Sequence, residues 1–173
     1  MFNLDDIGIV RGGGSSFQAR TEDRDTSGLT VTIKRGEVVK RAGTGGNFAL
    51  RIVDGEPQIG SDIVLGVASS ESDETASADG YVEVTQILPG TILRGKATTV
   101  ANIDTLAKLD LLRYDYITFD VSSLAQTIDE NEGDDPNKSG LCILDGDIVA
   151  GTLEVAVHIN VTLSGSLVGQ TID

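Results

Sequence analysis

The chain has 173 residues, the usual size of one domain, and it carries a net charge of −14 from 27 acidic and 13 basic residues. A negative field of this strength repels nucleic acid and anionic membranes, so we expect neither as a partner. The single cysteine excludes an internal disulfide, and no stretch reaches the roughly 20 apolar residues of a membrane helix. Because the N-terminus also lacks a basic signal segment, we expect the protein to be made and kept in a cytosol.

The first 28 residues predict a flexible N-terminal arm. Residues 11–16 read RGGGSS and residues 20–28 read RTEDRDTSG, and both stretches are too polar to pack by themselves. Such an arm either projects from the protein or becomes ordered by lying across another surface. Residues 1–51 also hold eight Lys or Arg against six Asp or Glu, whereas the rest of the chain holds five against 21. This end of the chain can therefore face an acidic partner.

Residues 29–173 predict a single β domain. Short apolar runs alternate with polar residues at period two, as in strands that bury one face. The predicted strands cover residues 29–34, 38–39, 48–53, 62–68, 81–88 and 116–121. The clearest alternation spans residues 153–163, and a tight Asp-Gly turn is predicted before it at residues 144–148. Since βαβ alternation is missing, the predicted fold class is all-β, either a β-barrel or a β-sandwich.

One short helix is predicted at about residues 103–113. Ile103, Leu106 and Leu109 fall at helical spacing there, and Asp104 can serve as the N-cap. We expect this helix to cover an open end of the sheet or to connect two strands. The acidic segments 69–80 and 129–140 are longer than hairpin turns and are predicted to be exposed loops.

Few residues offer catalytic or metal-binding chemistry. His158, the one histidine, lies on the polar face of its predicted strand and is interpreted as an exposed or interface residue, and Cys142 lies in an apolar run typical of a core. The glycines at residues 43–46 precede a strand, so they predict a turn and not a nucleotide site. The acidic loop at residues 129–135 departs from the EF-hand pattern. We therefore expect no enzyme activity, no cofactor and no metal.

Residues 33–105 resemble a known family. Gly36-Glu37-Val38-Val39 leads to IGSDIVLGVA at residues 59–68, and after an acidic loop ADGYVEV at residues 78–84 precedes a Pro89-Gly90 turn. This pattern resembles the head decoration, or cement, proteins of tailed bacteriophages. The resemblance implies a β-barrel or sandwich, commonly a homotrimer, that sits on the outer capsid surface of the virion and clamps subunits of the major capsid protein. The long N-terminal arm and the second acidic segment after residue 122 depart from the family pattern.

The resemblance and the charge distribution predict that the arm and the basic residues near it form the capsid-facing side. The predicted partner-binding residues are Arg11, Phe17, Arg20, Arg24, Lys34, Arg35, Lys40 and Arg41. An arm that becomes ordered on docking adds buried area at the cost of its conformational entropy. One alternative is a β domain of a tail, baseplate or fibre that contacts another virion protein or a host glycan. The other is a hydrolase, which would need carboxylates gathered in a deep pocket.

Overall fold

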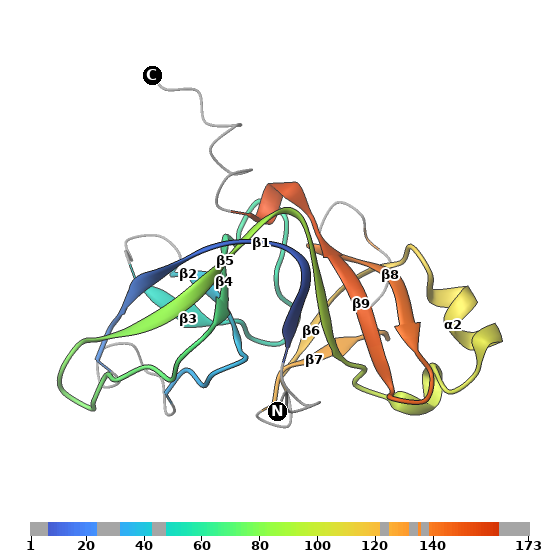
Figure 1. The fold of residues 1–173 in the computed structure, drawn as a ribbon, viewed down its shortest axis with the longest axis horizontal. Helices are drawn as coiled ribbons and strands as arrows, with labels where there is room; N and C mark the ends of the chain where they lie inside the picture. Colours follow the sequence, from blue (N-terminus) through green and yellow to red (C-terminus); the bar gives the residue numbers. More distant parts are fainter. Residues whose placement is uncertain are drawn as a thin grey trace, which may run out of the picture.

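One long strand, β5 (Gly80–Lys96), organises the fold, which we describe from a computed structural model (Figure 1). The structure describes residues 7–23, 32–42, 48–121, 125–131, 135 and 139–162. Their strands form one antiparallel sheet in the order β3-β2-β4-β5-β9-β8-β6-β7. β4 and β9 pair with successive parts of one edge of β5, and β1 pairs with the opposite edge. The prediction of an all-β fold with one short helix is confirmed.

The other elements precede and follow β5 along the chain. They are β1 (Gly8–Thr21), β2 (Val38–Arg41), β3 (Ala49–Arg51), β4 (Val64–Ala68), η1 (Val100–Asn102), α2 (Leu106–Leu112), β6 (Tyr116–Asp120), β7 (Thr127–Asp129), β8 (Leu141–Asp147), β9 (Thr152–Val157) and η2 (Ile159–Val161). Strands β2 to β6 confirm the predicted strands at residues 38–39, 48–53, 62–68, 81–88 and 116–121.

Two lobes lie on either side of the arch that β1 and β5 form together (Figure 1). The first lobe contains β2, β3 and β4 with the first half of β5, and the second lobe contains β6, β7, β8, β9 and α2 with the second half of β5. In the second lobe, Ile128 of β7 pairs with Ala97 and accepts a hydrogen bond from the Thr98 amide at 2.9 Å. The sheet is thus curled into a half-barrel.

A bend in β5 separates its two halves. Gly90 adopts a positive φ of 79°, and the Thr91 hydroxyl accepts a hydrogen bond from the Leu88 amide at 2.9 Å and donates one to the carbonyl of Gly12 at 2.7 Å. The side chain of Thr91 therefore links β1 to β5 where their pairing register shifts. The predicted Pro89-Gly90 turn is wrong as a chain reversal, because the strand continues beyond this bend.

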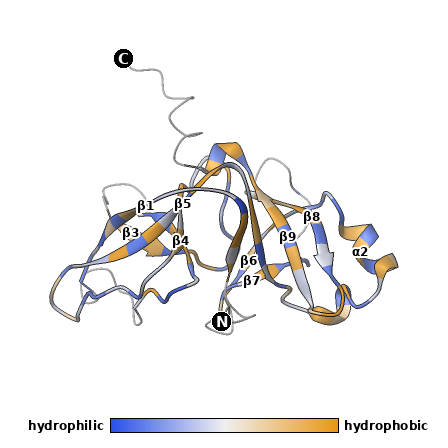
Figure 2. Ribbon diagram, in the orientation of Figure 1, coloured by the Kyte–Doolittle hydropathy of each residue, from blue (hydrophilic) through white to orange (hydrophobic). Residues whose placement is uncertain are grey.

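Two apolar clusters fill the fold, and β4 contributes to both. Val64 and Val67 belong to the larger cluster, which extends through the second lobe, whereas Leu65 and Ala68 belong to a smaller cluster in the first lobe. Burial on both faces explains the nearly continuous apolar sequence of β4, and Figure 2 shows apolar positions on the strands of both lobes. The smaller cluster comprises Ala19, Ile33, Val39, Ala49, Leu65, Ala68, Val82 and Val84.

The side chain of Gln126 joins the two lobes. Its Oε1 atom accepts a hydrogen bond from the Val38 amide at 2.5 Å, and its Nε2 atom donates to the Val38 carbonyl at 2.9 Å and to the Ile52 carbonyl at 3.5 Å. Gln126 is buried, and these contacts satisfy the amide of the first residue of β2 and add a second donor to its carbonyl, which also accepts the Ile52 amide at 3.2 Å.

The predicted flexible arm is partly wrong, because residues 8–21 form β1 and pair with β5 along their length. Ala19 and Thr21 are buried in this strand, so it belongs to the same folded unit as the rest of the chain. The physical reason is that main-chain hydrogen bonds to β5 order a segment whose glycine and serine content offers little side-chain packing. Residues 1–6 and 24–28 of the predicted arm lie outside the described residues.

The helix α2 is shorter than predicted and begins after a different cap. Thr105 is the N-cap, and its hydroxyl accepts from the Lys108 amide at 3.4 Å, whereas Asp104 forms an ion pair with the Lys108 ammonium at 2.7 Å. Leu109 and Ile103 are buried as expected, but Leu106 is exposed. In the described ranges, no helix is long and apolar enough to cross a membrane.

The strand predicted at residues 153–163 ends early. Strand β9 stops at Val157, and the next residues turn into η2, where the Nδ1 atom of His158 accepts a hydrogen bond from the Asn160 amide at 3.1 Å. Because the chain leaves the strand at this cap, the alternation of buried and exposed side chains stops there, and Ile159 is exposed although its position in the predicted strand would be buried. His158 thus has a local structural role that its position in the sequence did not indicate.

The turn predicted at residues 144–148 is also displaced. Gly146 lies within β8 opposite Leu153, and the chain reverses at residues 148–151. One carboxylate oxygen of Asp147 accepts hydrogen bonds from the amides of Val149 and Ala150 at 2.9 and 3.0 Å, and these bonds lower the pKa of Asp147. A bulge between residues 143 and 145 of β8 shifts the register and moves the reversal down the chain.

The acidic loops are less exposed than predicted. In the second of them, Glu130 is buried and accepts hydrogen bonds from the amide of Thr99 and the side chain of Asn102, both at 3.0 Å, so it holds η1 in place. In the first loop, Ser72 and Glu74 are buried. Acidic composition alone therefore did not distinguish solvated carboxylates from those that the fold encloses.

Candidate partner-binding surface

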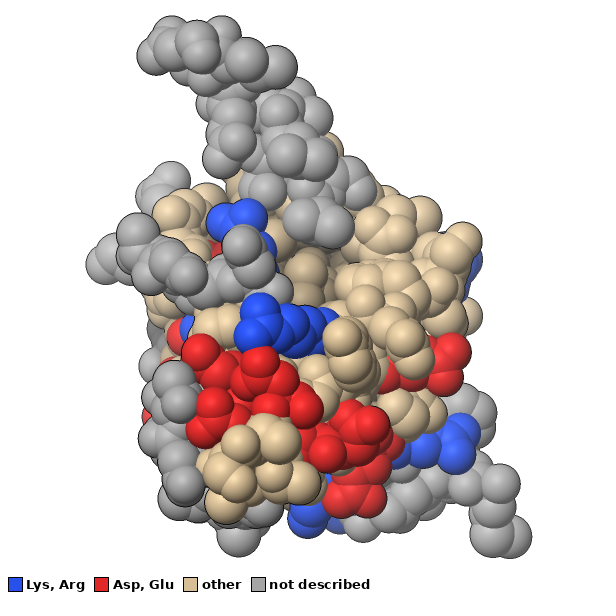
Figure 3. Space-filling model, turned by 90° about the vertical axis from the view of Figure 1, so that its left-hand side faces the viewer, with Lys and Arg blue, Asp and Glu red and all other residues tan. Residues whose placement is uncertain are grey.

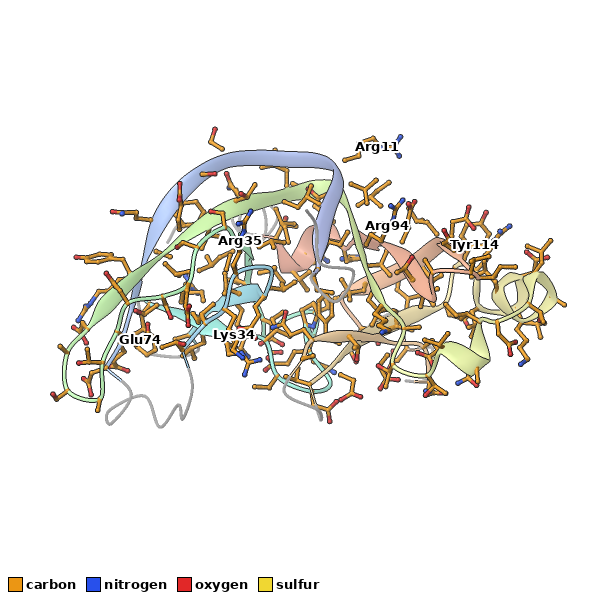
Figure 4. All side chains as sticks on the ribbon, turned by 60° about the horizontal axis from the view of Figure 1, so that its bottom comes forward. Arg11, Lys34, Arg35, Glu74, Arg94 and Tyr114 are labelled. Atoms are coloured by element: carbon orange, nitrogen blue, oxygen red, sulfur yellow. The ribbon has the colours of Figure 1, made fainter. Side chains whose placement is uncertain are left out.

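Four of the predicted partner-binding cations are exposed and form no ion pair with any described residue. They are Arg11, Lys34, Arg35 and Arg41. Arg11 projects from β1 near the bend, while Lys34 and Arg35 lie on the segment before β2 (Figure 4). The sequence predicts that these residues form one surface. In the structure they belong to three different segments, namely β1, the 34–36 turn and β2.

Glu37 fixes the turn that carries Lys34 and Arg35. Its carboxylate accepts the Lys34 amide at 2.8 Å and forms a two-point contact with Arg51 of β3 at 2.8 and 2.6 Å. A paired, two-point contact of this kind is among the stronger side-chain interactions. The two exposed cations therefore project from a turn that is held on both sides, which lowers the entropy lost when they contact a partner.

Lys40, also predicted to bind the partner, is largely enclosed and its charge is already paired within the fold. Its side chain is only 13% exposed, and its ammonium forms ion pairs with Glu56 and, at 2.9 Å, with Asp62. Burial alone would lower the pKa of Lys40, but the hydrogen bonds and charges of the two carboxylates outweigh it and raise that pKa. The carboxylates reach Lys40 from the 53–63 segment, which the sequence pattern around residue 40 does not reveal.

Arg20 is exposed but already paired. It forms an ion pair with Asp79, which also accepts the Asp23 amide at 3.0 Å. This contact raises the pKa of Arg20, while the Arg20 hydrogen bond and the Asp23 amide lower the pKa of Asp79. Arg20 thus ties the end of β1 to the 69–79 loop. Phe17 is half-buried against the smaller cluster, and Arg24 lies outside the described residues.

The outer edge of β1 is a feature that the sequence did not predict. β1 pairs with β5 on one side only, and no other described strand pairs with it. In an antiparallel strand alternate N–H and C=O groups point to the unpaired side, so an edge of this length can accept a strand from another protein. The three register shifts between residues 9 and 16 interrupt this edge, and its regular part covers residues 16–21.

A second exposed surface lies at the α2 end of the second lobe. Leu111 of α2 is 80% exposed, and Val149 in the β8–β9 turn is 93% exposed. Tyr114 is 70% exposed and adopts a φ of 72°, which is uncommon for a residue other than glycine. Figure 4 shows Tyr114 next to α2, far from Lys34 and Glu74.

Acidic residues gather at the opposite end, on the first lobe (Figure 3). The 69–79 loop of this lobe carries the exposed acidic residues Glu71, Asp73 and Asp79. The described residues contain no group of three or more His, Cys, Asp or Glu side chains arranged to hold a metal. Cys142 is half-buried, with its sulfur 3.6 Å from the carbonyl oxygen of Tyr114.

Comparison with known proteins yields no relative. The chain matches no protein-family model, no curated protein and no solved structure. The function therefore has to be inferred from the sequence and from the surfaces described above.

Proposed function

We propose that the protein is a virion structural protein that decorates the outer surface of a tailed-phage head and stabilises contacts between major capsid protein subunits. The proposal is supported by the resemblance over residues 33–105, a stretch that forms β2, β3, β4 and β5. A decoration protein binds many equivalent positions on a symmetric shell, so modest individual contacts give durable attachment when copies assemble as oligomers, with a trimer favoured.

The observation that carries the proposal is the location of the unpaired cations. Arg94, Lys108 and Arg113 of the second half of the chain all form ion pairs, whereas Arg11, Lys34, Arg35 and Arg41 form none with any described residue. Unpaired cations on a protein of net charge −14 are positions where an acidic partner can be recognised. We propose that these four residues contact the capsid.

The test is a binding measurement with particles from which the protein has been removed. The triple variant Arg11→Glu, Lys34→Glu and Arg35→Glu breaks no ion pair within the described residues, so we expect it to fold. Its affinity should fall by at least about tenfold, as is typical when several charge contacts across an interface are reversed. Lys108→Glu, which reverses a charge at the distant α2 end and breaks the ion pair with Asp104, is the control for a charge reversal outside this surface and should bind normally. Wild-type binding by the triple variant would remove these cations from the interface.

A tail, baseplate or fibre location is the second candidate, and Tyr114 favours it. An exposed tyrosine beside the exposed Leu111 resembles the aromatic and apolar contacts with which binding domains hold proteins or glycans. In that case Tyr114→Ser should abolish attachment to the particle, and the triple charge variant should have no effect.

A further inference from the structure

The buried end of the first lobe contains a carboxylate without a partner. Glu74 is only 4% exposed, and both of its carboxylate oxygens are enclosed without a hydrogen bond. The hydroxyl of Thr21 is likewise buried and unpartnered. Figure 4 labels Glu74 at the end of the first lobe, far from Tyr114 and α2. Buried polar groups almost always have a partner, so two such groups in one region call for a ligand that supplies it.

The two groups lie around the same backbone position, Gly80. Thr21 and Gly80 are opposite each other in the β1–β5 ladder, so the Thr21 side chain points to the face that a side chain on Gly80 would occupy. A Cβ on Gly80 would overlap the Glu74 amide nitrogen and would lie 2.7 Å from the Glu74 Cα and 2.5 Å from the Asp73 Oδ1. The absent side chain of Gly80 therefore lets the backbone of Glu74 and the Asp73 carboxylate pack against the position opposite Thr21.

Among the residues that the structure describes, no cation forms an ion pair with Glu74. Glu22, Glu71 and Asp79 add further acidic residues at this end. The nearby described cation is Arg20, which already forms an ion pair with Asp79. A buried carboxylate without a pairing cation is strongly unfavourable, and further negative charge around it increases the penalty. A bound cation would relieve both effects.

We propose that this end of the first lobe binds a hard divalent cation of the Ca²⁺ class through the Glu74 carboxylate and the Thr21 hydroxyl, with Asp73 on its outer side. Ca²⁺ takes six to eight oxygen ligands from carboxylates, hydroxyls, carbonyls and water, so two carboxylates are sufficient for a weak structural site. Asp73 accepts the Tyr81 amide at 2.6 Å through one oxygen, which leaves the other for the ion. The ion ties the 69–79 loop to β1, a role that is independent of the proposed capsid function and differs from the expectation of no metal.

The first test compares thermal unfolding of the chelator-treated full chain with and without CaCl₂. At a concentration of about one hundred times the dissociation constant, Ca²⁺ should raise the melting temperature by about 5–10 °C. Glu74→Gln should fold without added ion and should lose this shift. Glu83→Gln, which removes an exposed carboxylate from β5, is the matched control and should keep it. An unshifted wild type, or a Glu74→Gln variant that shifts equally, would overturn the proposal.

The second test locates the ion with Tb³⁺, which occupies Ca²⁺ sites and emits when a nearby tyrosine is excited. The chain has three tyrosines and no tryptophan, and only Tyr81 adjoins Gly80. Emission should be displaced by Ca²⁺, lost in Tyr81→Phe and retained in Tyr114→Phe, and Glu74→Gln should weaken Tb³⁺ binding by about 10- to 100-fold. Emission that survives in Tyr81→Phe would mean that the acidic surface binds ions elsewhere and would contradict the assignment.

Discussion

Gln126 shows how one side chain can replace part of a strand. Its amide group supplies a hydrogen-bond acceptor and a donor to Val38, on the other side of the boundary between the lobes. A glutamine before a short strand is an unremarkable residue in the sequence. Its role became visible only when β2 and the segment before β7 were placed together.

Gln126→Leu should lower the free energy of unfolding by about 1–3 kcal/mol, because it removes the partner of the buried Val38 amide, whereas the Val38 carbonyl keeps its hydrogen bond from the Ile52 amide at 3.2 Å. Urea denaturation followed by circular dichroism measures this change. Gln18→Leu, at an exposed position of β1, is the control and should stay within about 0.5 kcal/mol of the wild type. Equal effects of the two substitutions would show that Gln126 does not connect the lobes.

Lys40 shows that a basic stretch of sequence does not by itself guarantee an exposed cation. It lies in a basic stretch and alternates with Val39, so the sequence indicates a solvent-exposed cation, but Glu56 and Asp62 enclose it in the structure. Lys40→Met should destabilise the protein by about 3 kcal/mol, because it leaves two partly enclosed carboxylates without their cation. Arg41→Met removes an exposed and unpaired cation from the same strand, and it should cost less than about 0.5 kcal/mol. Chemical denaturation at neutral pH gives both values.

The contribution of Lys40 should also depend on pH in a defined direction. Its pKa is higher in the folded protein than its ordinary value, so its stabilising effect is fully present below the pKa of the unfolded chain. The effect is lost as the pH rises through the higher pKa of the folded state. The difference in unfolding free energy between wild type and Lys40→Met should therefore be constant near neutral pH and shrink at alkaline pH. A difference that grows at alkaline pH would contradict this assignment.

At the scale of elements, strand pairing explains which predictions succeeded. β2, β4 and β6 carry β-branched or apolar residues whose packing selects a strand, and the sequence revealed them. β1 carries glycine and serine, and its order comes from main-chain bonds to β5, which composition does not encode. The early end of β9 depends on a local hydrogen bond of His158, and periodicity cannot detect such a bond.

The contact of β4 with β5 gives a prediction at this scale. A Cβ on Gly66 would overlap the Thr85 carbonyl oxygen and would lie 2.6 Å from a Val84 methyl group. Gly66→Ala should therefore push the two strands apart and cost about 3 kcal/mol or more. Gly60→Ala adds a Cβ where no atom lies within 4 Å, so it should cost only the roughly 1 kcal/mol of its positive φ. Thermal unfolding of the two variants measures the difference.

The candidate site was only partly predictable. The basic character of the N-terminal third was visible in composition, and Arg11, Lys34, Arg35 and Arg41 remain exposed and without ion pairs to the described residues. A cation can contact a partner only if no carboxylate of the fold already pairs with it. For Lys40 the pairing carboxylate comes from residue 56, which is distant in the sequence. The buried Glu74 was hidden because the acidic loop that contains it has the composition of a solvated one.

At the scale of the whole molecule, the two lobes share the strands β1 and β5 and one apolar cluster. β5 contributes to both lobes, and the larger cluster contains Val38 of the first lobe and Val155 of the second. We therefore expect a single cooperative unfolding transition, with the same midpoint by circular dichroism and by tyrosine fluorescence. Two separate midpoints would show that the lobes fold independently.

The charge distribution of the whole chain gives the proposed function its orientation. The four exposed cations without an ion pair to any described residue belong to residues 1–51, whereas residues 52–173 carry 21 acidic and five basic residues, and acidic residues gather at one end of the first lobe (Figure 3). A protein of this kind can attach through its cations while the acidic surface keeps it soluble and prevents unspecific association. We expect the surfaces that carry these cations to contact the shell and the acidic end of the first lobe to stay solvated.

Electron microscopy of the particle with which the protein co-purifies tests the central claim most directly. We predict density for the protein at many equivalent positions on the outer surface of the head, with Arg11, Lys34 and Arg35 toward the shell. Density confined to the tail, or a copy number too low to cover the lattice of the head, would contradict the proposed function.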